Sequence, residues 1–164
     1  MPRSSLFYVL SSLLIFAPQS VFAQTATSPF TVQMTITADC QITSAGNLSF
    51  GSAGLISSNR DATSTLTVQC TNGTAYNLGL NEGAGTGATV TSRLMTGPAS
   101  ATIGYALYRD TARSTVWGNT VGTNTVSASG TGSTQTYTVY GRVASQTTPA
   151  AGAYTDTVTV TVTY

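Results

Sequence analysis

The chain has 164 residues, with six arginines, five acidic residues and no lysine or histidine. Without histidine it has neither a Ser-His-Asp or Cys-His catalytic arrangement nor an imidazole metal ligand. Its balanced charge excludes the basic surface that binds nucleic acid or an anionic membrane. The composition predicts a structural protein, not an enzyme, with no cofactor or metal site.

The first 23 residues are predicted to be a secretory signal peptide. Arg3 precedes an apolar run over residues 6–17, which is well short of the roughly 20 residues that a membrane-spanning helix needs. The sequence Val21-Phe22-Ala23 then suits a signal peptidase. We expect cleavage between Ala23 and Gln24, and a mature chain of about 140 residues is a typical single domain. An uncleaved membrane anchor is the alternative.

The segment 24–37 is predicted to be a strand-forming arm. It has a polar start, after which Phe30, Val32, Met34 and Ile36 alternate with polar residues, and a period of two is typical of a β-strand. The pattern alone leaves two interpretations open. The segment is either an ordinary first strand of its own sheet or a mobile arm that pairs elsewhere.

The two cysteines, Cys40 and Cys70, follow this segment. Two cysteines in an exported chain are expected to form a disulfide, which indicates an oxidising compartment. The alternative is a free nucleophilic cysteine, which would need a basic neighbour to lower its pKa.

The two-residue period continues to the end of the chain. Alternating apolar residues occupy 66–70, 76–80, 103–107, 137–143 and 158–162. Segments rich in Gly, Ser, Asn and Pro separate them, at 51–59, 72–73, 82–88, 97–98, 118–132 and 149–152. Short strands at this spacing predict an all-β antiparallel sandwich or barrel. The last alternating segment, 154–164, runs to the final residue, so its edge is expected to need a cover from elsewhere.

Two groups of side chains are candidates for other roles. A carboxylate pair, as in glycosidases, is an alternative because separation in sequence does not exclude proximity in space, and the acids available are Asp39, Asp61, Glu82, Asp110 and Asp156. A solvated surface or an ion pair is the default for each of them. The segment 118–132 is low in complexity and is expected to be a flexible loop, with packing against a neighbouring subunit as the alternative.

The residues resemble the spore coat protein U domain family, which includes subunits of archaic, Csu-type chaperone-usher pili. The resemblance extends over the whole mature chain. It rests on Phe30-x-Val32, Cys40-x-Ile42, Leu48-x-Phe50-Gly51, Leu66-x-Val68-x-Cys70-Thr71-x-Gly73-Thr74-x-Tyr76, Arg93-x-Met95, Ile103-x-Tyr105-x-Leu107-Tyr108-x-Asp110, Trp117-Gly118, Tyr140-Gly141-Arg142 and Pro149-x-x-Gly152-x-Tyr154-x-Asp156-x-Val158-x-Val160. Each piece is weak alone, but their order is specific.

The resemblance implies an incomplete immunoglobulin-like sandwich over 38–164 that lacks its last strand. A neighbouring subunit would complete it by β-strand addition, a mode for which pilins are a known example. The donor residues would be Phe30, Val32, Met34 and Ile36 of the arm 24–37. The implied partners are other pilin subunits, a periplasmic chaperone and an outer-membrane usher.

The implied location is a cell-surface fimbrium reached through the periplasm, and the implied role is adhesion and biofilm formation. Two other functions stay open. One is a secreted spore or cell coat protein. The other is a carbohydrate-binding module, which would need an exposed platform drawn from Tyr105, Tyr108, Trp117, Tyr137, Tyr140 and Tyr154.

Overall fold

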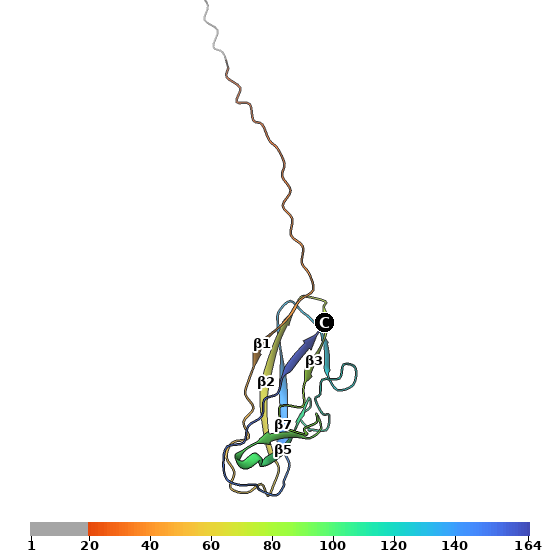
Figure 1. The fold of residues 1–164 in the computed structure, drawn as a ribbon. Coiled ribbons are helices and arrows are strands. Elements are labelled where there is room, and N and C mark those ends of the chain that lie inside the picture. Colours follow the sequence, from red (N-terminus) through yellow and green to blue (C-terminus); the bar gives the residue numbers. More distant parts are fainter. Residues whose placement is uncertain (1–19) are drawn as a thin grey trace, which may run out of the picture. The chain divides into compact units, whose positions relative to one another are not determined.

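A computed structural model describes residues 20–164 (Figure 1). The apolar run of the predicted signal peptide, 6–17, lies outside the described residues. The chain divides into two units, Met1–Thr35 and Ile36–Tyr164. In the first unit, residues 20–35 form no helix or strand, and Phe30, Val32 and Met34 are between 82% and 86% exposed. The alternating arm is therefore not an ordinary first strand in this structure, and its donor role stays a prediction.

The second unit is a sandwich of eight short strands (Figure 1). They are β1 (Cys40–Ala45), β2 (Arg60–Cys70), β3 (Ala75–Leu80), β4 (Arg93–Thr96), β5 (Thr102–Tyr108), β6 (Val126–Ser129), β7 (Thr134–Val143) and β8 (Val160–Thr163). A 3-10 turn, Pro98–Ser100, joins β4 to β5. No helix in the described part of the chain has the length and apolar character needed to cross a membrane.

The strands form two antiparallel sheets, which confirms the predicted all-β antiparallel sandwich. The larger sheet has the order β1-β2-β7-β5-β4, and the smaller has the order β6-β3-β8. The longest ladder joins β2 to β7, from Arg60 opposite Val143 to Gln69 opposite Thr134. Because the side-chain period of a strand is two, Leu66 and Val68 of β2 face the core while its threonines face outward.

The core fills the space between the two sheets. Its most buried apolar side chains are Leu66, Val68, Tyr76, Leu78, Leu80, Leu107, Trp117, Val139 and Val143. Polar atoms of the core aromatics are hydrogen-bonded, since the Trp117 indole donates to the Leu78 carbonyl at 2.8 Å and the Tyr76 and Tyr137 hydroxyls meet across the sheets. A buried polar atom without a partner would be costly, and these contacts remove that cost.

The Cys40–Cys70 disulfide is present and joins the first residue of β1 to the last residue of β2. The two cysteines are also partners in the β1–β2 ladder. Both are buried, so the bridge is part of the core.

The segment 118–132 is not wholly a loop, which corrects the sequence-based expectation. Residues 126–129 form β6, which pairs with β3 from Ala75 opposite Ser129 to Leu78 opposite Val126. Val126 and Ala128 pack against the core, and Ser127 Oγ donates to Asn77 Oδ1 at 2.6 Å. Four residues are too few to show a period above the Thr, Ser and Gly around them.

Arg93 is a fully buried cation in β4. Its guanidinium donates to four main-chain carbonyls: Asn81 at 2.8 Å, Val90 at 2.7 Å, Leu80 at 3.1 Å and Trp117 at 2.8 Å. Burial lowers the pKa of Arg93, since it disfavours the charged form. The planar fork of arginine can satisfy several acceptors at once, so this one side chain ties the end of β3 to two loops.

Removing the disulfide should lower stability. The chain-entropy model assigns a loop closed by 30 residues roughly 3.7 kcal/mol of stabilisation. We expect the Cys40→Ala/Cys70→Ala variant to lose stability of that order in urea unfolding and to be degraded faster by an added protease. Wild-type protein treated with reductant is the control and should match the variant. Equal urea midpoints for oxidised and reduced protein would contradict the prediction.

Truncation of Arg93 should be more harmful than truncation of a surface arginine. Arg93→Ala leaves the carbonyls of Leu80, Asn81 and Trp117 without their buried donor, and such a loss costs about 3–5 kcal/mol. Arg142→Ala is the matched control, since its fork to Asp61 lies at the surface. Urea unfolding of the two variants measures the difference, and equal losses would show that the buried bonds contribute little.

Candidate functional site

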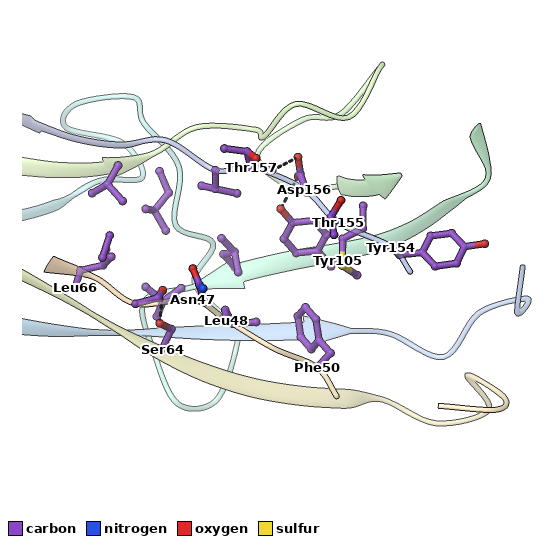
Figure 2. A pocket seen from close by; sticks show the side chains of 18 residues that line it. Asn47, Leu48, Phe50, Ser64, Leu66, Tyr105, Tyr154, Thr155, Asp156 and Thr157 are labelled. Carbon is purple, nitrogen blue, oxygen red and sulfur yellow. Dashed lines mark hydrogen bonds between the residues drawn. The ribbon is translucent and has the colours of Figure 1, made fainter. Parts of the chain in front are cut away.

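The candidate site is a hollow between the outermost strands of the two sheets (Figure 2). β1 pairs only with β2, and β8 pairs only with β3, so each sheet ends at an unpaired edge on this side. The cavity between these edges has a volume of about 400 Å³. We call it the groove. A packed protein interior rarely leaves a void larger than a water molecule, which occupies roughly 30 Å³ in the liquid, so the groove has room for an additional element.

Two stretches of chain form the walls of the groove. One is the continuation of β1, where Leu48 and Phe50 lie against the backbone of Gly141 in β7. The other is the segment 154–160, which leads into β8. In this second wall Tyr154, Asp156, Val158 and Val160 are half-buried and alternate with exposed threonines. Figure 2 shows Leu48, Phe50, Tyr154 and Asp156 arranged around the hollow.

The floor of the groove is the hydrophobic core itself. It consists of Leu66, Leu80, Tyr105, Leu107 and Val139, which come from both sheets. The Phe50 and Tyr105 rings meet edge-on, with centroids 6.2 Å apart. The surface is therefore apolar over most of its area and suits aliphatic or aromatic side chains. A dry cavity of about 150 Å³ already accepts a benzene-sized group, so this groove has room for more than one apolar side chain.

A carboxylate fixes the wall at one end of the groove. Asp156 accepts a hydrogen bond from the Tyr105 hydroxyl at 2.6 Å and from the amides of Ala84 and Thr157 at 2.7 Å each. Burial, together with the bond to Asp156, raises the pKa of Tyr105, so the hydroxyl stays a donor. Gly83 has a φ of +88°, and a Cβ there would overlap the Asp156 carboxylate, so glycine is required at this turn.

Outside the groove, hydrogen bonds join the end of the chain after β8 to the segment before β1. There the Tyr164 hydroxyl, after β8, donates to Asp39 Oδ1 at 3.1 Å, just before β1. Thr71 also fixes the segment before β1. Its amide donates to the Asp39 carbonyl at 2.9 Å, and its hydroxyl donates to the Thr37 carbonyl at 3.2 Å. The groove begins beyond these contacts, where residues from 45–50 and 154–160 line it.

The other carboxylates have separate partners. Asp61 accepts both arms of the Arg142 fork at 2.7 and 2.8 Å and lies 3.2 Å from Arg113, and the bond to Arg142 lowers the pKa of Asp61. Asp110 caps a loop, accepting bonds from Ser114 and Thr115 that hold its pKa at about 2. Among residues 20–164 no group of His, Cys, Asp and Glu is placed to hold a metal ion.

The aromatic residues are distributed over the core, the outer face of the larger sheet and the wall of the groove. Trp117 and Tyr105 are buried, and Tyr137 is half-buried against Tyr76. Tyr140 lies on the outer face of the larger sheet opposite Tyr108, with the Arg113 guanidinium 5.8 Å from its ring. The candidates for an aromatic binding platform are therefore not gathered on one surface.

Sequence reasoning identified the terminal alternation at 154–164, and the family resemblance implied a sandwich left open by a missing strand, but neither gave the residues that line the groove. Within 154–164, Val160–Thr163 form a ladder with β3, while 154–159 has an isolated β-bridge between Thr155 and Thr96 and hydrogen bonds between Thr159 and Asn81. The structure brings Leu48, Phe50, Tyr105 and Val160 together from distant parts of the sequence. The donor residues of the arm and the cleavage after Ala23 stay predictions.

Comparison with known proteins gives concordant results. Protein U of Myxococcus xanthus is 34% identical over 168 residues, covering 94% of this chain and 92% of that protein. Among solved structures, a chain of the CsuC–CsuE chaperone–tip adhesion subunit pre-assembly complex, from the archaic chaperone-usher Csu pili of Acinetobacter baumannii, matches with a TM-score of 0.58 and 26% identity. The match covers 79% of this chain but only 40% of that one.

The model of the Spore Coat Protein U domain matches residues 26–161, which is most of the chain. This family and the pilin-type fold are structural and not enzymatic. The resemblance inferred from the sequence motifs is confirmed, and the chain belongs to the Spore Coat Protein U domain family.

Proposed function

We propose that this protein is a structural subunit of a chaperone-usher surface pilus and that it polymerises by donor-strand exchange. The observation that carries the proposal is the apolar groove between the unpaired edges of β1 and β8. A groove lined by the core leaves apolar surface and backbone groups that only an added strand can cover together. The match to a complex of archaic Csu pili supports this function.

The arm is the proposed occupant of the groove of the next subunit. Phe30, Val32, Met34 and Ile36 have the two-residue spacing that directs four side chains to one face. Their side chains are exposed, Ile36 least at 67%. The seven residues 30–36 match in number the wall 154–160, and both extend about 20 Å as strands.

The energy available to this assembly is substantial. Burying four apolar side chains at about 1.5–3 kcal/mol each contributes roughly 6–12 kcal/mol before the cost of ordering the arm. The backbone bonds of a new strand add to this sum. Before assembly, a periplasmic chaperone would cover the groove, and an usher in the outer membrane would receive the subunit. The pilus would then support adhesion and biofilm formation.

A coat component is the second candidate, and it is favoured by the family name and by the identity to Protein U. Such a protein would share the sandwich and the export route. It differs in needing no usher, so deletion of the usher would abolish surface display of a pilin but not of a coat protein.

Charges on the apolar face of the arm, which carries Val32 and Met34, should prevent polymerisation. In Val32→Asp/Met34→Asp the carboxylates would have to enter the apolar groove, so we expect an exported, chaperone-bound chain that forms no polymers resistant to sodium dodecyl sulfate. The matched control is Thr31→Asp/Gln33→Asp, which places the same charges on the other face of the arm and should still polymerise. Normal polymers from the first variant would argue strongly against the donor role.

A charge in the groove should have the reciprocal effect. Val158→Asp alters a half-buried wall residue, whereas Thr159→Asp alters its exposed neighbour and serves as the control. The Val158 variant keeps its arm but should not accept another. When it is co-expressed with the Val32→Asp/Met34→Asp chain, one intact arm meets one intact groove. We expect dimers from the mixture, detected by gel electrophoresis without heating, and monomers from either variant alone. Longer polymers or no dimers would refute head-to-tail exchange.

A further inference from the structure

Gln24 is the residue that removal of the predicted signal peptide would place at the amino end. The sequence Val21-Phe22-Ala23 precedes it, and this inference rests on the proposed export with cleavage after Ala23. In the structure Gln24 is exposed and belongs to no helix or strand. Among residues 20–164 the side chain of Gln24 makes no hydrogen bond. The hydrogen bonds nearest to the amino end involve Thr37 and Asp39. Its amide group is therefore free to react with its own backbone nitrogen.

We propose that the new amino-terminal Gln24 cyclises to pyroglutamate. The α-amino nitrogen attacks the side-chain carbonyl carbon Cδ, and a new C–N bond closes a five-membered lactam. The bond from Cδ to the side-chain nitrogen breaks, and ammonia leaves with a proton from the α-amino group. No oxidant, reductant or other reactant is consumed. An α-amino group titrates near neutral pH, so the free nucleophile is available, and the attack gains from being intramolecular.

The reaction has an unusual consequence in this sequence. The chain contains no lysine, so after cleavage the α-amino group of Gln24 is its single primary amine. Cyclisation removes that amine and its positive charge. The mature chain then carries only guanidinium cations, on Arg60, Arg93, Arg109, Arg113 and Arg142. Reagents and enzymes that require a primary amine would find none on the protein.

The lactam would protect the donor arm. Only residues 24–29 separate the new amino end from Phe30, and the arm is exposed along this length. An exposed segment without secondary structure is a preferred substrate of proteases. Aminopeptidases require a free α-amino group, and a lactam at Gln24 denies them that group before they can shorten the arm toward Val32.

The test is chemical analysis of the exported protein as it is purified. Intact protein is first treated with an amine-reactive reagent, which marks any free amino end before digestion, and the amino-terminal peptide is then examined by mass spectrometry. We expect a peptide that starts at residue 24, is lighter than the uncyclised peptide by one ammonia, and carries no label. Because the label is added to the intact protein, a lactam that was already present can be distinguished from one that forms later, during digestion or mass spectrometry.

Two variants make the result specific. Gln24→Ala cannot cyclise and should take one label per chain, with the arm trimmed faster by an added aminopeptidase. Gln33→Ala removes an interior glutamine of the same arm and should behave like wild type. A labelled wild-type chain that begins at Gln24 would overturn the cyclisation while leaving the proposed cleavage intact. A chain that begins at any other residue would overturn both, and neither result would bear on polymerisation, which the groove and arm variants test.

Discussion

The unpaired edges of β1 and β8 are the constraint on which the rest of the structure depends. Both sheets stop on the same side of the core, and the half-buried Leu48, Val158 and Val160 line a groove that no further strand of the described residues fills. An exposed edge promotes pairing with another chain, and an apolar groove promotes burial. Here the two tendencies coincide at one place, which explains why a chain with few charges and a threonine-rich surface would assemble there and not elsewhere.

A groove without an occupant needs walls that hold their position. Asp156 fixes one wall by accepting hydrogen bonds from Tyr105 and Ala84. Arg93 fixes the end of β3 by donating to the carbonyls of Leu80 and Asn81. These are polar contacts around an apolar hollow, and they are directional. Hydrophobic contacts alone would allow the walls to collapse into the space, so these polar contacts preserve the shape of the groove.

Much of the sandwich could be predicted from the sequence because long strands show the period of two. The alternation at Leu66, Val68 and Cys70 gave β2 its inward face, and the same argument held for β3, β5 and β7. β6 was missed because Val126 and Ala128 are its only apolar residues. The resemblance implied an open groove, but its lining could not be predicted, since it depends on how Phe50, Tyr105 and Val160 meet in space, and no periodicity encodes that.

The position of the disulfide has a mechanical meaning. Cys40 is the first residue of β1, an edge strand held by one neighbour, whereas Cys70 ends β2, which is paired on both sides with β1 and β7. Tension on the chain before Cys40 is therefore passed through the covalent bridge to an interior strand. β1 therefore cannot separate from β2 beginning at its first residue, and the load reaches the long β2–β7 ladder.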